Sequence, residues 1–195
     1  TIPKTVTKAG IDVFEESELK TATIENGATT VADNLFSNAK NLTKVTIPNT
    51  VKKIGSMSFY HCEKLSSVTL PKNLNEIGYK AFDSTKALKS ITIPKTVTEN
   101  GNYVFLNSGI ETAIIENGAT SVPNNLFSKA TNLTQITIPN TVKKIGSMSF
   151  YDCTKVSSVT LPNTLTSIET SAFENCQAMK SITIPKNVTY FGTTA

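Results

Sequence analysis

The fold is decided by residues 42–62, which read LTKVTIPNTVKKIGSMSFYHC. The first part alternates polar residues with β-branched apolar residues. This predicts a short strand over 44–47 that ends at Pro48, because proline cannot donate to a β-ladder. The remaining spacing predicts a compact return turn or a second short extended segment, and it is too short for a long helix. The apolar positions are Leu42, Val45, Ile47, Val51, Ile54 and Phe59.

The same pattern recurs along the whole chain with a period of 22 or 23 residues. An Ile-Pro or Leu-Pro step marks most copies, whereas Ile24-Glu25 and Ile115-Glu116 mark the two copies in which glutamate replaces proline. The 195 residues therefore contain eight full repeats and a partial ninth. A unit of this size cannot bury its own apolar face, so its neighbours must cover it in a stacked solenoid.

A second period of 91 residues spans four of these repeats. Residues 41–60 and 132–151 are identical apart from two substitutions, so a four-repeat block is duplicated. We therefore expect residues 1–195 to form one continuous leucine-rich-repeat-like solenoid without an internal domain boundary. The chain starts at Thr1 without a methionine or a signal peptide, and we expect it to be a piece of a longer protein. Unpaired strands at its ends would favour weak end-to-end self-association.

One column of the repeat is phenylalanine in eight successive copies, which leaves only Phe191 outside it. One ring per repeat at a constant offset predicts a continuous buried stack of rings along the solenoid. We interpret this column as core packing and not as a binding surface. Its members are Phe14, Phe36, Phe59, Phe82, Phe105, Phe127, Phe150 and Phe173.

Every repeat returns to its start by the same path, so neighbouring strands must run in the same direction. We therefore predict a repeat solenoid with one parallel β-sheet of about nine short strands, about 40 Å long at the usual strand spacing. Ala9 and Asn100 replace the isoleucine of an Ile-Gly step that the other repeats favour. We expect the two 22-residue units that contain these replacements to be the loosest.

The repeat has the form L-x-x-[VI]-T-[IL]-P-x-x-[VL]-x-x-I-G-x-x-[AS]-F-x-x-C, carried for example by 68–71 (VTLP), 77–82 (IGYKAF) and 149–153 (SFYDC). It resembles the BspA-like leucine-rich repeats, a family of bacterial surface proteins that is also expanded in some parasitic protists. The resemblance covers essentially the whole chain. It implies a curved solenoid with a parallel sheet on one face, a cell-surface or secreted location, and adhesion to host matrix proteins or other bacteria. The family has no fixed set of binding residues, so the resemblance assigns no site.

The composition and the motif inventory exclude several functional classes. Lys and Arg together number 19 and every one is lysine, which argues against nucleic-acid binding, where the arginine guanidinium is the usual tool. No stretch is long and apolar enough for membrane insertion. The single histidine, His61, belongs to no catalytic motif, and no P-loop, dinucleotide or zinc-protease motif occurs. We expect neither an enzyme nor a cofactor.

Three cysteines, Cys62, Cys153 and Cys176, occupy one column of the repeat. Cys62 and Cys153 lie four repeats apart, about 19 Å at the usual strand spacing, which is too far for a disulfide. Cys153 and Cys176 are in adjacent repeats, where a bridge is conceivable. Because alanine and threonine fill the same column elsewhere, we favour buried free thiols. The ligands do not converge, so we expect no metal site.

The exposed side of the predicted strands carries the main candidate for a binding surface. It is flat, rich in hydroxyl groups and nearly uncharged, although Lys44 and Gln135 interrupt the neighbouring column. Hydrogen bonding to a partner, the ordinary preference for threonine on exposed strands, and ordering of water as in ice-binding proteins all remain open. We name the main column the threonine face, and its members are Thr23, Thr46, Thr69, Thr92, Thr137, Thr160 and Thr183.

Two further patches recur at the 91-residue offset, each with two lysines near a tyrosine that we expect to be exposed. They are interpreted either as two equivalent contact patches or as solvated turns. Their members are Lys52, Lys53 and Tyr60 in the first block and Lys143, Lys144 and Tyr151 in the second.

Two functions fit these observations. The first is an extracellular binding or adhesion module that presents a repeated strand face to a protein or a glycan. The second is a passive spacer that carries another domain away from the cell surface, which near-identical blocks fit equally well. We expect no nucleic-acid partner.

Overall fold

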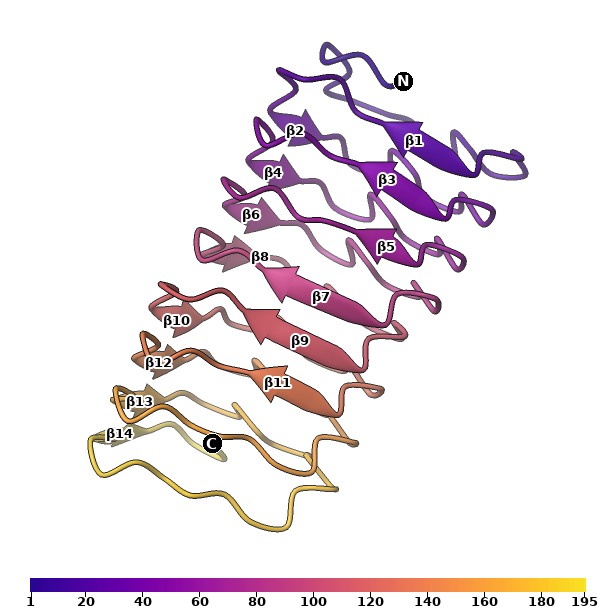
Figure 1. Cartoon of the computed structure of the whole chain (residues 1–195). Coiled ribbons are helices and arrows are strands. Elements are labelled where there is room, and N and C mark those ends of the chain that lie inside the picture. Colours follow the sequence, from indigo (N-terminus) through magenta and orange to yellow (C-terminus); the bar gives the residue numbers. More distant parts are fainter.

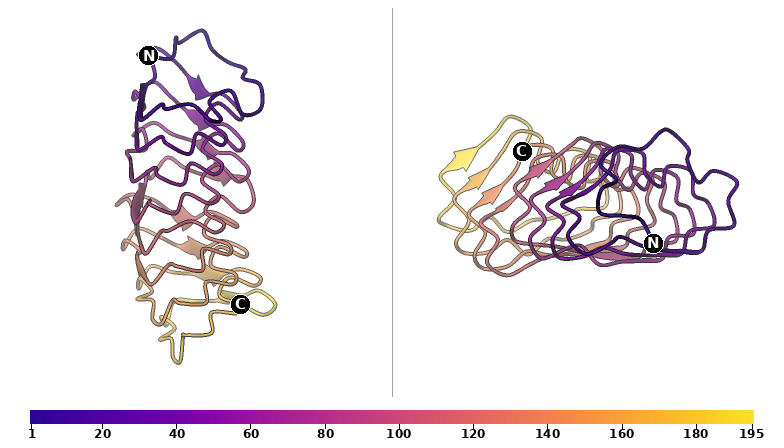
Figure 2. Two further views of the ribbon diagram at one scale, coloured as in Figure 1. Left: turned by 90° about the vertical axis from the view of Figure 1, so that its right-hand side faces the viewer. Right: turned by 90° about the horizontal axis from the view of Figure 1, so that it is seen from above.

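A computed structural model describes residues 1–195, and it shows a stack of similar turns with strands on two sides and no helix (Figure 1). The amino terminus lies at one end of the stack and the carboxyl terminus at the other. Seen from above, successive turns are progressively offset from one another (Figure 2). The predicted repeat solenoid of parallel strands is confirmed.

The first strip of strands contains the segment that the sequence pattern identifies. The strand predicted over 44–47 is present as Lys44–Thr46, directly before Ile47 and Pro48. The strip consists of two three-stranded parallel sheets, β1-β3-β5 and β7-β9-β11. Its strands are β1 (Thr21–Thr23), β3 (Lys44–Thr46), β5 (Ser67–Val68), β7 (Ser90–Ile93), β9 (Thr112–Ile115) and β11 (Gln135–Thr137).

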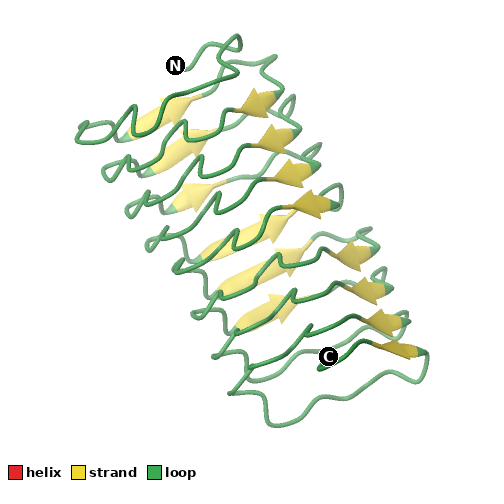
Figure 3. Cartoon of the chain, turned by 180° about the vertical axis from the view of Figure 1, so that it is seen from behind, coloured by secondary structure: helices red, strands yellow, loops and turns green.

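A second strip lies on the opposite side of each turn, where the chain returns (Figure 3). It consists of two four-stranded parallel sheets, β2-β4-β6-β8 and β10-β12-β13-β14. Its strands are β2 (Thr30–Val31), β4 (Lys53–Ile54), β6 (Glu76–Ile77), β8 (Glu99–Asn100), β10 (Ser121–Val122), β12 (Lys144–Ile145), β13 (Ser167–Ile168) and β14 (Tyr190–Phe191).

The predicted strand count therefore needs a correction. The structure contains fourteen strands in four sheets, where we predicted about nine strands in one sheet. Of the two alternatives for the second half of each repeat, the short extended segment is right, and it forms a ladder of its own. In the first strip the segments 158–161 and 181–184 form no strand.

The phenylalanine column forms the predicted buried stack. Six of its rings are fully buried, while Phe14 and Phe173 at the two ends are partly buried. Neighbouring ring centroids are 5.1 to 5.6 Å apart, with interplanar angles between 5° and 23°. The rings belong to a single core of 47 buried apolar residues, which joins all the repeats.

The turns that carry the rings are joined by a ladder of backbone hydrogen bonds. The N–H groups of Met57, Phe59 and His61 donate to carbonyl oxygens of the next turn at 2.8 to 2.9 Å. The carbonyl oxygens of Ser58 and Tyr60 accept from the turn before. Met57 and His61 have positive φ, which aligns these peptide groups along the stack.

The Ile-Gly step of the repeat has a packing explanation. A Cβ on Gly55 would lie 2.5 Å from the backbone nitrogen of Asp33 in the turn before, which is too close for any side chain. The glycine thus lets neighbouring turns approach each other after the second strip.

The ladders are interrupted at different levels on the two sides. The second strip breaks between β8 and β10, at Asn100, which replaces the isoleucine of the repeat. Asn100 lies in one of the two units that are expected to be the loosest. The first strip breaks between β5 and β7, one repeat earlier. Since β6 pairs with β8 and β7 pairs with β9, each break on one side is bridged on the other.

Candidate binding surface

The threonine face lies along the first strip of strands. In β3, Val45 is buried whereas Lys44 and Thr46 are exposed, and the same alternation holds in β1 and β7. All seven threonines of the column are exposed, as are Lys44 and Gln135. The predicted exposure is confirmed, and the role of the face in binding stays a prediction.

The hydroxyl groups of the threonine face are free. None of the seven donates or accepts a hydrogen bond within the protein, in contrast to threonines in the turns. Thr50 Oγ1, for example, donates to the carbonyl oxygen of Ala28 at 2.7 Å, and Thr96 Oγ1 donates to Leu74 at 2.6 Å. The face is therefore a row of uncommitted donors and acceptors, which a partner can use without breaking internal bonds.

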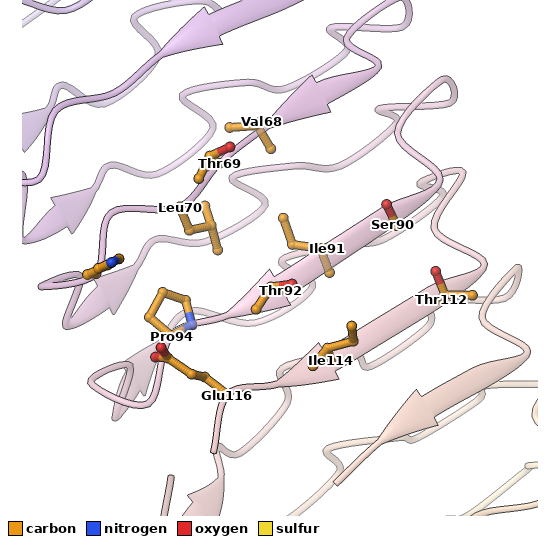
Figure 4. Close-up of a pocket in the computed structure, with 11 residues that line it drawn as sticks. Val68, Thr69, Leu70, Ser90, Ile91, Thr92, Pro94, Thr112, Ile114 and Glu116 are labelled. Atoms are coloured by element: carbon orange, nitrogen blue, oxygen red, sulfur yellow. The ribbon is translucent and has the colours of Figure 1, made fainter. Parts of the chain in front are cut away.

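Three shallow depressions lie on this side of the molecule. The first, of about 330 Å³, is lined by segments of β5, β7 and β9, with Thr69, Ser90 and Thr92 beside Val68 and Ile91 (Figure 4). The second, of about 340 Å³, lies between 158–163 and 181–185. The third, of about 370 Å³, lies between 134–137 and 157–160.

Each depression lies at a place where the strand ladder is open. No backbone hydrogen bonds join 67–70 to 90–93, and none join 158–161 to either neighbouring repeat. The segments 67–70 and 158–161 are the first-strip segments of the two repeats that end in Leu-Pro. Leucine lacks the β-branch of isoleucine and has a lower strand propensity, although 67–68 still pairs with β3 on its other side.

One position departs from the threonine column. Ile114 stands there with 47% of its surface exposed, beside the first depression. The charged residues of this depression are Lys72 and Glu116, and Glu116 Oε2 accepts a hydrogen bond from the Lys95 backbone nitrogen at 2.9 Å. The depression is thus mostly neutral, with apolar and hydroxyl-bearing walls.

In each lysine–tyrosine patch one lysine forms an ion pair with the next turn, and the role of the patches in binding stays a prediction. Lys53 Nζ lies 2.9 Å from Glu76 Oε1, and Lys144 Nζ lies 3.3 Å from Glu169 Oε1, so each pairs with a carboxylate of the next turn. The hydrogen bond to Glu76 raises the pKa of Lys53 above its ordinary value.

The two tyrosines of these patches differ from the prediction. Tyr60 and Tyr151 are half-buried, and the Tyr60 ring lies 4.3 Å from the His61 ring and 6.0 Å from Lys80 Nζ. The aromatic contacts of Tyr60 thus involve residues other than the lysines assigned to its patch, and the expected exposure of the two rings is wrong. Lys52 and Lys143 are exposed.

Sequence reasoning missed a cluster of aromatic and basic side chains on the turns. Lys80 Nζ lies 5.5 Å from the centre of the Tyr79 ring, and Tyr79 packs edge-on against Tyr103 at 6.4 Å. Lys129 Nζ lies 5.7 Å from the Tyr103 ring. Its signal in the sequence is a break in the 91-residue repeat, because threonine stands at position 170, where a second tyrosine would repeat Tyr79.

The three cysteines are buried free thiols, as predicted. Each Sγ donates to a phenylalanine carbonyl oxygen of the turn before, at 3.0 Å for Cys62, 3.1 Å for Cys153 and 3.2 Å for Cys176. Burial raises the pKa of Cys62 to about 12 and of Cys176 to about 11. These thiols stay protonated at neutral pH, so they lack the reactivity of a thiolate.

Other kinds of site have no support in the structure. No group of three or more histidine, cysteine, aspartate or glutamate side chains is placed to hold a metal ion. The structure also contains no helix with the length and apolarity that crossing a bilayer requires.

Comparison with known proteins points to one family. The family model described as BspA type leucine rich repeat region matches the chain in six copies, over residues 1–111 and 100–195. No curated protein matches the chain.

Several solved structures share the fold. A leucine-rich repeat protein from Eubacterium ventriosum is 31% identical with a TM-score of 0.74, over 98% of this chain and 56% of its own. One from Bacteroides ovatus is 24% identical with a TM-score of 0.74, over 89% of this chain and 48% of its own. A leucine rich cell surface protein from Faecalibacterium prausnitzii is 22% identical with a TM-score of 0.51, over 93% of this chain and 77% of its own. The chain spans about half the length of the first two.

Proposed function

Because the chain belongs to the BspA-type leucine-rich repeat family, we propose that it is a cell-surface or secreted module that binds an extracellular partner through the threonine face. The partner is a protein or a glycan. The family is one of bacterial surface proteins, and one structure that shares the fold is described as a cell surface protein. Repeat folds of this family are generally non-enzymatic, and we propose no catalytic role.

One observation carries this proposal: the hydroxyl groups of the threonine face are exposed and have no partner within the protein. The contrast with Thr50 and Thr96, whose hydroxyls bond to the backbone, shows that the fold does not need the hydroxyls of the face. When several weak, equivalent contacts form at the same time, the overall affinity for the partner is much higher than that of a single contact. The face therefore suits a long partner better than a small molecule.

The test is a binding screen of the folded protein against immobilised matrix proteins, mucins and glycans at several salt concentrations. We expect saturable binding that tolerates salt, because the face is nearly uncharged. The triple variant Thr46→Lys, Thr69→Lys and Thr92→Lys should lose at least about tenfold in affinity, since bulky cations replace hydroxyls on adjacent strands.

A matched control places the same substitutions elsewhere. Thr29, Thr98 and Thr120 are exposed and precede β2, β8 and β10 on the opposite strip. Changing all three to lysine adds the same charge and should leave binding intact. Equal losses in both triple variants would remove the threonine face as the site. If the folded protein binds no member of the panel, the result would favour the spacer function.

A further inference from the structure

The first two depressions of the threonine face share two lining segments at the 91-residue offset. The first is lined by 68–72, 90–94 and 112–116, and the second by 158–163 and 181–185, so both segments of the second follow a counterpart in the first by 91 residues. Their volumes are about 330 and 340 Å³. The duplication has therefore produced two similar hollows on one face, the first of which extends to β9.

The shared parts of the two hollows have similar chemistry, while Thr112, Ile114 and Glu116 line only the first. Every lining residue that they share by position is identical except one, where Lys72 of the first corresponds to Asn163 of the second. Their shared part contains a valine, an isoleucine, two threonines and a serine, and the strand ladder is open between its two segments. Each thus offers a small apolar patch among hydrogen-bonding groups that have no partner.

The spacing of the hollows indicates which kind of ligand can occupy both. They lie four repeats apart, which is about 19 Å at a strand spacing of about 4.8 Å. Two identical sites at this distance match a ligand that presents the same group twice along its length. We propose that they form a bivalent site for a neutral linear polysaccharide that runs along the stack and crosses the strands. This inference rests on the proposed function and names its partner.

Three observations favour a neutral polysaccharide. The second hollow has no charged residue in its lining, and the first has one lysine and one glutamate, Lys72 and Glu116, so neither hollow has the net positive charge that suits an acidic glycan. Hydroxyl groups and open backbone groups match sugar hydroxyls, while the valine and isoleucine match the C–H face of a sugar ring. A polysaccharide repeats its units by nature, whereas a peptide does so only when its sequence repeats.

The shallow form of the hollows explains why two are needed. Each is near the lower end of the usual ligand-pocket range of roughly 300–1,000 Å³ and lies on an open face, so a single hollow binds weakly. A chain that reaches both gains from the high effective concentration of its second unit. Binding strength should therefore depend on oligosaccharide length.

The experiment measures binding of neutral cello-, manno- and malto-oligosaccharides of two and eight units by calorimetry and NMR titration. For the sugar that binds, we expect two weak sites for the disaccharide and one bound octasaccharide per chain, with an affinity at least about tenfold higher. Thr69→Ile with Thr92→Ile removes two threonine hydroxyls from the first hollow, and Thr160→Ile with Thr183→Ile removes the two corresponding ones from the second. Either pair of substitutions should abolish one of the two disaccharide sites. It should also abolish the higher affinity of the octasaccharide over the disaccharide.

The control pair is Thr23→Ile with Thr46→Ile, which lies in the same column outside both hollows. Ile114 occupies this column in the native chain, so isoleucine is compatible with the strand. Circular dichroism and gel filtration would show that all variants are folded and unassociated. The control pair should bind like the native protein, and an equal effect of all three pairs would overturn the proposal, as would a single disaccharide site.

The outcome separates this inference from the proposed function. A protein partner that is lost with the lysine triple variant, without any sugar binding, would overturn the polysaccharide site and leave the interaction module intact. Binding of an uncharged Ser/Thr-rich peptide, with no binding of any sugar, would also overturn the polysaccharide site and leave the interaction module intact. Failure of every sugar, peptide and protein probe would overturn both.

Discussion

At the scale of the residue, the phenylalanine column shows how one side chain serves the whole stack. Phe82 is fully buried between Phe59 and Phe105, with centroid distances of 5.1 and 5.5 Å. Each interior ring thus contacts a ring on both sides, whereas Phe14 at the edge contacts only Phe36 and is partly buried. The energetic value of a ring should depend on its place in the column.

We predict that Phe82→Ala lowers the free energy of unfolding by about 3–5 kcal/mol, because it leaves a cavity between two stacked rings. Urea denaturation followed by circular dichroism measures the change. Phe14→Ala is the matched comparison and should cost clearly less. Equal costs would mean that the stack adds nothing to the burial of single rings.

The cysteines give a second prediction at this scale. Burial raises the pKa of Cys62 to about 12, above the value of about 8.5 for a free thiol. The folded protein should therefore react very slowly with a thiol reagent at pH 8, and rapidly in urea. Because the unfolded thiol ionises first, the stability from this group is present below pH 8.5 and is lost as pH rises toward 12. Fast labelling of the native protein at pH 8 would contradict the buried assignment.

At the scale of the element, Asn100 marks the break between β8 and β10. It occupies the column of Ile54 and Ile77, its Oδ1 is buried without a hydrogen-bond partner, and its Nδ2 donates to the Asn124 carbonyl oxygen at 2.7 Å. The side chain therefore crosses the break with one bond while leaving another polar atom unsatisfied.

We predict that Asn100→Ile raises the free energy of unfolding by about 1 kcal/mol, since it removes an unsatisfied buried acceptor and restores an apolar column. Ile77→Asn, one repeat earlier, should destabilise the protein by more than this. Urea denaturation of both variants provides the test. Destabilisation by Asn100→Ile would show that the bond to Asn124 holds β8 and β10 together.

Much of the fold could be predicted from single elements of the sequence. The alternation before Pro48 placed β3, and the phenylalanine column predicted the ring stack. The sequence does not distinguish a turn from a short extended segment in the second strip, because Lys53–Ile54 is too short for a periodic pattern. The open ladders at 67–70 and 158–161 could not be predicted, since they depend on how tightly neighbouring repeats stack. The prediction that the Tyr60 side chain is exposed was wrong, and Lys80 of the next turn lies 6.0 Å from its ring.

At the scale of the whole molecule, the breaks in the two strips are staggered. Wherever the first strip is open, between β5 and β7 or around 158–161, the second strip is paired through β6-β8 or β12-β13-β14. The core also runs without interruption through both blocks. We therefore propose that the chain behaves as one folding unit.

This proposal predicts a single cooperative unfolding transition in urea, with the same midpoint by circular dichroism and by exposure of the three thiols. Cys62 reports on the first block and Cys153 and Cys176 on the second. Different midpoints for the two blocks would contradict it and would place a folding boundary at the break near Asn100.

The ladder of the turns gives the molecule a direction. The peptide groups at 56–57, 58–59 and 60–61 all point their N–H toward the next turn and their C=O toward the previous one. Repetition of this arrangement adds small dipoles along the axis, as in a helix. At these turns, one end of the stack therefore presents carbonyl oxygens and the other presents N–H groups. A second copy that continues this ladder must join head to tail, because like ends would set carbonyl against carbonyl or N–H against N–H.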